Sequence, residues 1–286
     1  MRGITKILAV IDSRKEEQLA LARAAQFSRI SGATLHILSP NPNATIESMN
    51  RLEALAAPLV KEGLDIHLHE TWHDHLTDTI IHIRQIERCH LIIKDARPLK
   101  AMKNTFKTPN DWSLLRRSRV PVLLVKTDKP WDHAPILAAI NADPDDYHHT
   151  AMNTAILDYA SELAFAYASE VHLATAYPTT NLAARNYQDN ITDEQAYRQH
   201  CIEYIHRYNL DEKHVFVEPG PTETMITKII KDSDARLLVL GTHARTGLGA
   251  FAIGNTAEQL ISQIDTDILV LQPRHHMMPL ERELDN

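Results

Sequence analysis

Short, nearly continuous apolar runs alternate along this chain with longer stretches in which apolar residues recur every three or four positions. The short runs are typical of strands that are buried on both faces of a parallel sheet. The longer stretches are typical of amphipathic helices, which cover such a sheet with their apolar side. Strands that alternate with helices in this order predict right-handed crossovers and therefore a doubly wound α/β fold.

The whole pattern occurs twice. A run from Ile7 to Asp12 returns as Ile136 to Asn141, and each run ends in a short polar side chain. Further strands are expected at 34–40, 65–69, 91–94 and 122–126, and again at 171–174, 214–218, 237–240 and 268–272. Helices are expected between them at 16–31, 44–62 and 74–85, and again at 154–169, 194–208 and 222–231. We therefore predict two tandem domains, at residues 1–128 and 133–275, each with about five parallel strands and helices on both faces.

Ligands of open parallel sheets bind beyond the carboxyl ends of the strands, in the crevice where the strand order reverses. One window of the second copy holds five of the eight glycines of the chain, namely Gly220, Gly241, Gly247, Gly249 and Gly254. Glycine allows a phosphate to approach the backbone closely, and a helix that opens at Asn255 and Thr256, with Thr256 as its cap, attracts an anion. Arg245 adds a positive charge. A phosphate-binding loop is therefore predicted, although a loop that only caps the helix fits the same pattern.

The spacing of this loop resembles a known family. Gly241, Ala244 and Gly254-Asn255 follow the frame Gly-x2-Gly-x9-Gly-[Ser/Thr/Asn], which is the phosphate loop of the universal stress proteins. The resemblance covers essentially the whole chain as two tandem domains. It is closest to the tandem "E" branch of bacterial universal stress proteins, through the tract 108–112 and the linker Lys129-Pro130-Trp131.

This resemblance implies a cytoplasmic stress-response protein whose second domain acts as a nucleotide-responsive binding or regulatory module. Some members of the family bind ATP or related adenine nucleotides, and others do not. In members that bind, an Asp at the end of the first strand approaches the ribose or Mg²⁺, and the base lies near the second strand. Asn141 takes the place of that Asp here, and the strand that starts at Val171 runs past the base. The residues expected to face the phosphates are Gly241, His243, Arg245, Gly254, Asn255 and Thr256.

Two departures from the family pattern predict weak or altered nucleotide binding. Ala244 replaces a glycine and adds a Cβ to the loop, and Asn141 is a poorer Mg²⁺ ligand than a carboxylate. The first copy keeps Asp12, but it has no glycine between Gly63 and Gly220 and cannot form the loop. We therefore expect the first copy to be structural or to bind a different ligand.

Two other functions remain open. The same loop could support slow ATP hydrolysis with His243 as acid or base, but no partner at a suitable spacing is present, so no catalytic residue is assigned. The first copy could instead carry an apolar ligand, which would make the protein a scaffold or carrier. Among seventeen histidines, His67 and His69 share one face of a strand, a spacing that can chelate zinc. The alternative to a zinc site is that these histidines lie at the edge of the sheet and face solvent. The sequence requires no cofactor.

Composition restricts the partners and the compartment. The formal net charge of −7 argues against a nucleic-acid binder, and no uncharged apolar run is long enough to span a membrane. A first strand that begins near Ile4 leaves no room for a signal peptide, and two isolated cysteines suit a reducing cytoplasm. In dimers of the resembling family the last strands pair antiparallel. We therefore expect Val122–Val125 and Ile268–Leu271 to pair as an internal pseudo-dimer in a monomeric chain.

Overall fold

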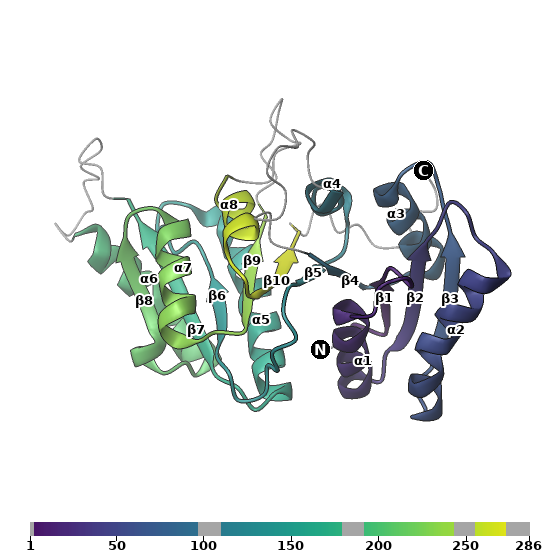
Figure 1. Ribbon diagram of the computed structural model, residues 1–286. Helices are drawn as coiled ribbons and strands as arrows, with labels where there is room; N and C mark the ends of the chain where they lie inside the picture. Colours follow the sequence, from purple (N-terminus) through teal and green to yellow (C-terminus); the bar gives the residue numbers. More distant parts are fainter. Residues whose placement is uncertain (1–2, 97–109, 179–191, 243–254, 273–286) are drawn as a thin grey trace. The chain divides into compact units, whose positions relative to one another are not determined.

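The computed structural model describes residues 3–96, 110–178, 192–242 and 255–272, without the side chains of residues 110 and 255–258 (Figure 1). The chain divides into two compact units, the first of which contains residues up to Asp128, while the second begins at Lys129. None of the described helices combines the length and the apolar composition that a membrane crossing requires.

The first unit is built on a parallel sheet. Its strands lie in the order β3 (Ile66–Thr71), β2 (Thr34–Pro40), β1 (Lys6–Val10), β4 (Leu91–Asp95) and β5 (Val122–Val125). The chain reverses its direction of travel across the sheet between β1 and β4, so the crevice expected to hold a ligand lies between those two strands. This is the doubly wound order that the alternation of strands and helices predicts.

Helices cover both faces of this sheet. They are α1 (Leu19–Ser31), α2 (Ile46–Lys61), α3 (Leu76–Glu87) and α4 (Asn110–Arg117). Right-handed crossovers place α1 and α2 on one face and α3 and α4 on the other, where these two helices contact each other. Helix α1 begins three residues later than predicted because Gln18 Nε2 donates to the backbone carbonyls of Asp12, at 2.8 Å, and Lys15, at 2.7 Å. These bonds hold the preceding residues as a loop.

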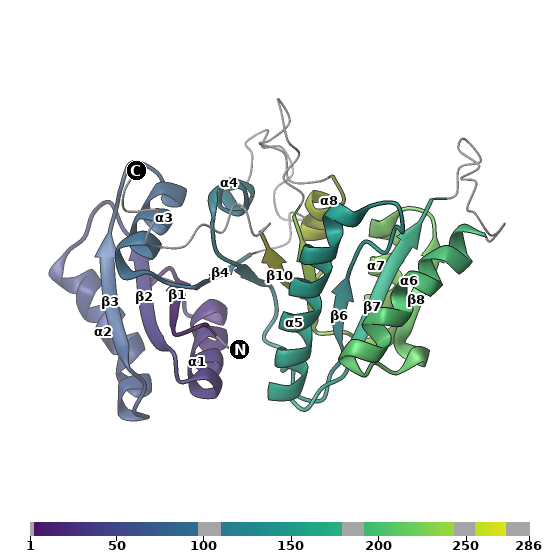
Figure 2. The same cartoon turned by 180° about the vertical axis from the view of Figure 1, so that it is seen from behind.

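The second unit repeats the arrangement (Figure 2). Its parallel strands lie in the order β8 (Val215–Pro219), β7 (Val171–Tyr177), β6 (Ile136–Ala139), β9 (Leu237–Gly241) and β10 (Asp267–Leu271). Its helices are α5 (Thr150–Ala166), α6 (Asp193–Tyr208), α7 (Thr222–Ser233) and α8 (Asn255–Gln263), with short 3-10 turns η2 (Tyr147–His149) and η3 (Glu212–His214). Helix α5 begins four residues earlier than predicted because η2 leads directly into it. The predicted α/β fold in two tandem copies is confirmed.

The strand registers align the two copies residue by residue. Leu8 of β1 lies opposite His36 of β2, and Leu137 of β6 lies opposite His172 of β7. On the other side, Val10 pairs with Lys94, and Ala139 pairs with Leu240. The same alignment matches Asp12 to Asn141 and Asp95 to Gly241. Differences between the copies can therefore be assigned to single positions.

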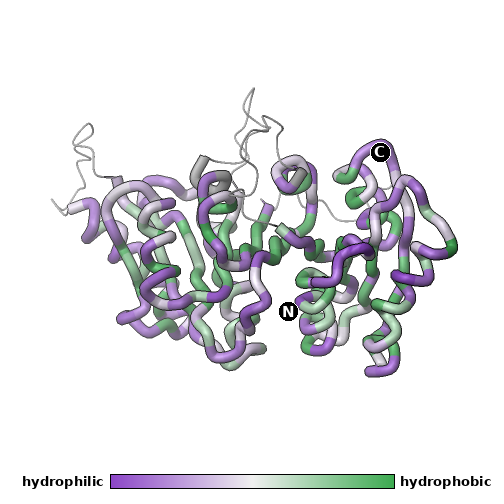
Figure 3. The backbone as a smooth tube through the Cα atoms, viewed as in Figure 1, coloured by the Kyte–Doolittle hydropathy of each residue, from purple (hydrophilic) through white to green (hydrophobic). Residues whose placement is uncertain are grey.

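The core explains the apolar runs of the sequence. Strands β1, β5, β6 and β10 are almost entirely buried, whereas β3 and β8 at one edge of each sheet are half-buried. Figure 3 shows the hydropathy of each residue along the same backbone. The linker residue Trp131 is fully buried in the second unit, where its Nε1 donates to Asp267 Oδ2 at 3.0 Å. Cys89 and Cys201 are both free and buried, which confirms them as small core residues. The pairing of the two fifth strands stays a prediction.

Candidate functional site

A pocket of about 310 Å³ lies in the second unit, in the crevice between β6 and β9. This is where the strand order reverses, so the pocket has the position expected of a ligand site in an open α/β sheet. Its wall is formed by the carboxyl ends of β6, β7 and β9 and by residues of α5, α7 and α8. The residues that matter most below are Asn141, His149, Met152, Asn153, Leu240 and Gly241.

Asn141 follows β6 and is held by the loop around it. Its Oδ1 accepts from the backbone N–H of Asp143 at 3.0 Å. Its own backbone N–H donates to Asn153 Oδ1 at 3.1 Å, and Asn153 Nδ2 donates back to the Asn141 carbonyl at 2.6 Å. This reciprocal pair ties the end of β6 to the first turn of α5. The Asn141 amide is therefore fixed at the pocket wall before any ligand enters.

One N–H of the Asn141 side-chain amide points at a ring nitrogen of His149 that also contacts Asp146. Nδ1 of His149 lies 3.2 Å from Asn141 Nδ2 and 2.7 Å from Asp146 Oδ2. A single ring nitrogen cannot accept from the amide while donating to the carboxylate. The contact with Asp146 is shorter and joins the ring to a charged group, so we infer that the proton points to Asp146. Among the described residues, the Asn141 N–H directed at His149 then lacks an acceptor.

Gly241 ends β9 and is needed for close packing. A Cβ built at this position would lie 2.5 Å from both Cγ and Sδ of Met152, which extends from the first turn of α5. The side chain of Met152 is 9% exposed and forms part of the pocket wall. Gly241 and Asn141 therefore meet at one pocket, as the predicted site requires, with Met152 lying over the end of the strand.

The other predicted site residues are placed differently. Val171 is the first residue of β7 and lies at the amino end of that strand, whereas Ala176, near its carboxyl end, lines the pocket. His243, Arg245 and Gly254 lie outside the described residues. Helix α8 begins at Asn255, so Thr256, which the sequence suggested as the cap, lies within the first turn.

In the first unit the position of Gly241 is taken by Asp95. The Oδ1 atom of Asp95 accepts from the backbone N–H of Ala20, in the first turn of α1, at 2.7 Å. Lys15 Nζ lies 3.7 Å from Oδ2 of the same carboxylate. Helix amino ends and lysines are the groups that attract a bound anion. In this copy a carboxylate of the chain itself already occupies them.

Asp12, the counterpart of Asn141, is also engaged. Its Oδ1 accepts from the backbone N–H of Arg14 at 3.1 Å and from Arg14 Nε at 2.8 Å, and its Oδ2 accepts from Arg14 Nη2 at 3.0 Å. The side-chain hydrogen bond from Arg14 holds the pKa of Asp12 below its usual value. The first crevice is therefore lined by charged groups that are paired with each other.

Comparison with known proteins fits this architecture of two copies. The family model described as the universal stress protein family matches the chain twice, at residues 3–126 and 144–272. The chain belongs to the universal stress protein family. It is 29% identical over 304 residues to Universal stress protein E of Salmonella typhi, with 96% of each chain covered. The predicted resemblance to the "E" branch of this family of stress-response proteins is confirmed.

Solved structures of relatives share the complete fold. A putative universal stress protein of Pseudomonas aeruginosa UCBPP-PA14 superposes with a TM-score of 0.86 at 33% identity and 99% coverage of both chains. A functionally unknown protein of Pseudomonas aeruginosa PAO1 superposes with a TM-score of 0.85 at 34% identity, covering 99% of this chain and 98% of its own. The tandem arrangement is thus common to these proteins.

Three residues of the pocket were not found from the sequence. His149 ends η2, and Met152 and Asn153 lie in the first turn of α5. All three precede the helix expected at 154–169, so the helical pattern gave no reason to single them out. Asn153 carried the clearest signal, because it stands three and four residues before Ile156 and Leu157 and so shares their apolar helix face; the structure buries it to 1% exposure. Buried amides need hydrogen-bond partners, so its position next to the strand end was open to inference.

Proposed function

We propose that the second domain binds an adenine nucleotide in the crevice between β6 and β9 and that the protein acts as a nucleotide-responsive module in the stress response. The observation that carries this proposal is the contrast between the copies. The second copy has a pocket bounded by Asn141 and Gly241, and the first copy places Asp95 and the Asp12–Arg14 pair at the same positions. One binding site per chain is therefore expected.

The chemistry of the pocket suits a nucleoside with its phosphates directed toward the helix ends. Its walls include Ile140, Ile156 and Leu240, which offer apolar surface to a flat base. None of the described residues that line it carries a carboxylate, so an anionic ligand meets no direct repulsion from them. Thr222 brings the amino end of α7 to the same pocket, and this end of a helix favours negative charge.

Asn141 supplies the expected polar contact. Its amide N–H, for which His149 offers no acceptor when the ring donates to Asp146, is suited to a ribose hydroxyl oxygen. Because an amide is a poorer ligand for Mg²⁺ than a carboxylate, we expect binding that depends little on Mg²⁺. Replacing Asn141 by Asp should make binding more dependent on Mg²⁺.

Calorimetry with ATP and ADP on the full chain tests the proposal, and the repeat supplies a matched control. Asn141 and Asp12 each accept from the backbone N–H two residues ahead, so alanine perturbs the same kind of turn in each copy. Loss of one ligand hydrogen bond, worth ~1 kcal/mol, should raise the Kd of Asn141→Ala about fivefold. Asp12→Ala should leave the Kd unchanged. Absence of binding to the wild type, or equal effects of both variants, would refute the proposal.

The alternatives receive less support. Hydrolysis would depend on His243 and Arg245, which lie outside the described residues. An apolar ligand in the first crevice would face Lys94 and Asp95 at the end of β4 and Asp12 after β1, and these charged side chains do not favour it.

A further inference from the structure

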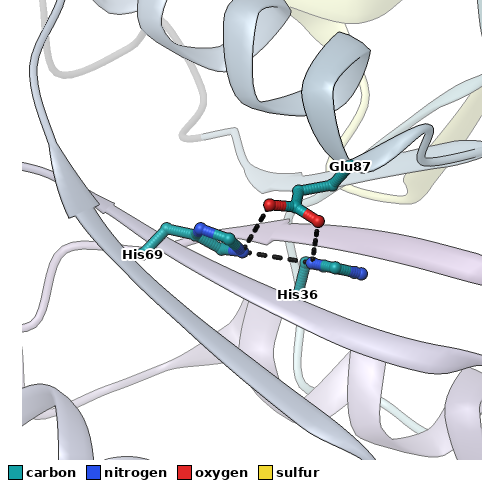
Figure 4. A group of neighbouring side chains, drawn as sticks. All are labelled: His36, His69 and Glu87. Atoms are coloured by element: carbon teal, nitrogen blue, oxygen red, sulfur yellow. Dashed lines mark hydrogen bonds and ion pairs between the residues drawn. The ribbon is translucent and has the colours of Figure 1, made fainter.

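Three potential metal ligands converge in the first unit, away from the crevice (Figure 4). Nδ1 of His36 lies 3.1 Å from Nε2 of His69 and 3.6 Å from Oε2 of Glu87. Nε2 of His69 lies 4.0 Å from Oε1 of Glu87. The three groups come from β2, β3 and the last residue of α3.

We propose that His36, His69 and Glu87 form a binding site for a divalent transition-metal cation, with Zn²⁺ as the favoured ion. Two imidazoles and one carboxylate are a ligand set that zinc uses, with a fourth position left for water. Tetrahedral zinc with bonds of ~2.0–2.2 Å holds neighbouring ligand atoms about 3.3 Å apart. The three separations lie close to this value, so movements of a few tenths of an ångström at each side chain complete the geometry.

The fold fixes this arrangement through the strand register. His36 pairs with His67 and Leu38 pairs with His69, so residues 67 and 69 face the same side as His36. Helix α3 packs on β2 from that side and ends at Glu87. The His67 ring stacks on His36 with its centroid 4.9 Å away, and its Nε2 lies 3.6 Å from Asp65. His67 thus forms a wall of the site, and it is His69 that directs a nitrogen into it.

The three proposed ligands are partly buried. The side chains of His36, His69 and Glu87 are 1%, 17% and 27% exposed, so the site is largely enclosed but open to an ion beside the glutamate. One shared proton can satisfy the two facing nitrogens, but it leaves the carboxylate without a positive partner. A bound cation accepts a lone pair from each ring nitrogen and balances the charge of the carboxylate.

The second copy shows what the site looks like without two of its ligands. His172 and His214 take the places of His36 and His67, and their rings stack with centroids 4.2 Å apart. The register places Phe216 at the position of His69, and Ser233 ends α7 as Glu87 ends α3. Glu170 approaches His214 from a loop, but its side chain is 68% exposed. The stacked pair is common to both copies. Glu170, His172 and His214 also approach each other in the second copy, but the carboxylate there is exposed, whereas the side chain of Glu87 is only 27% exposed.

The test uses the full chain, stripped of metal with a chelator and titrated with Zn²⁺ by calorimetry. Co²⁺ serves as a spectroscopic probe, because tetrahedral coordination gives strong visible absorption. We expect one Zn²⁺ per chain and a tetrahedral Co²⁺ spectrum. His69→Phe and Glu87→Ser, which install the residues of the second copy, should each weaken binding at least tenfold and remove the spectrum. Glu87→Gln checks that loss of charge rather than loss of fold is responsible, with thermal unfolding of each metal-free variant as the control.

His214→Gln in the second copy is the matched control and should leave the stoichiometry, affinity and spectrum unchanged. Weak binding of several ions that is indifferent to His69→Phe and Glu87→Ser would overturn the proposal. So would an octahedral Co²⁺ spectrum, or loss of the tight ion in His214→Gln.

Discussion

The contact between Gly241 and Met152 leads to a prediction about the geometry of the pocket. An alanine at position 241 would place its Cβ 2.5 Å from Cγ and Sδ of Met152, which is closer than non-bonded atoms can approach. Overpacking costs typically ~1–3 kcal/mol, but the clashing atoms belong to a flexible side chain that can shift into the pocket it lines. Gly241→Ala should therefore lower the free energy of unfolding by only about 1 kcal/mol. The backbone of Gly241 adds no strain, because its φ lies outside the left-handed region.

Met152→Ala should be destabilising for a different reason. Met152 is 9% exposed, and truncation of a buried Met costs ~2–5 kcal/mol. We expect the lower end of that range, because Met152 lines an open pocket. Its side chain therefore packs against protein on one side only, and truncation removes fewer contacts. In the double variant the new Cβ at position 241 fills space that the Met152 side chain vacated. The two effects should therefore not add, and the coupling should be about 1 kcal/mol.

The four proteins of this cycle are unfolded in urea, and the unfolding is monitored by circular dichroism. The nucleotide affinity of each folded protein is measured separately. Gly241→Ala should narrow the pocket and weaken ATP binding, and Met152→Ala should widen it. Unfolding energies that add to within ~0.5 kcal/mol would mean that the side chains do not meet. The described packing of α5 against β9 would then be refuted.

Two further predictions concern stability. Burial lowers the pKa of His172 to about 4. The unfolded chain, with a histidine pKa near ~6.5, takes up this proton first as the pH falls. The free energy of unfolding should therefore drop between pH 6.5 and 4, by up to ~3 kcal/mol, and stay level above that range. Urea titrations across this range should show a smaller drop in His172→Gln, and an unchanged drop would contradict the assignment. In the first copy, Asp95→Gly removes the carboxylate that accepts from Ala20 N–H at the start of α1 and should cost ~1 kcal/mol. Asp95→Asn should keep most of the stability, and equal losses in both variants would argue against the hydrogen bond.

Much of the fold followed from the sequence because of how parallel sheets are buried. β1 and β6 have helices on both faces, so their apolar runs are continuous and easy to locate. Helix starts were less predictable, because they depend on loop contacts such as those of Gln18, which a periodicity does not reveal. The right-handed crossover rule explains which face of the sheet each helix covers, whereas the order of the strands within the sheet came from the structure.

The sites were predictable only in part. The spacing of His67 and His69 located one wall of the proposed metal site, but His36 and Glu87 come from other elements. The register between β2 and β3 brings His36 close to His69, and the packing of α3 on the sheet brings Glu87 close to both. The pattern of a single strand encodes neither. In the same way, the glycine pattern pointed to Gly241 but not to Met152, since their contact depends on where α5 begins.

We propose that nucleotide binds in the second copy and not in the first. Photolabelling of the full chain with an azido-adenine analogue of ATP, followed by peptide mapping, tests this claim directly. Label should appear on peptides around the ends of β6, β7 and β9, and excess ATP should abolish it. Label on peptides of residues 3–96, or labelling that ATP does not compete away, would contradict the account.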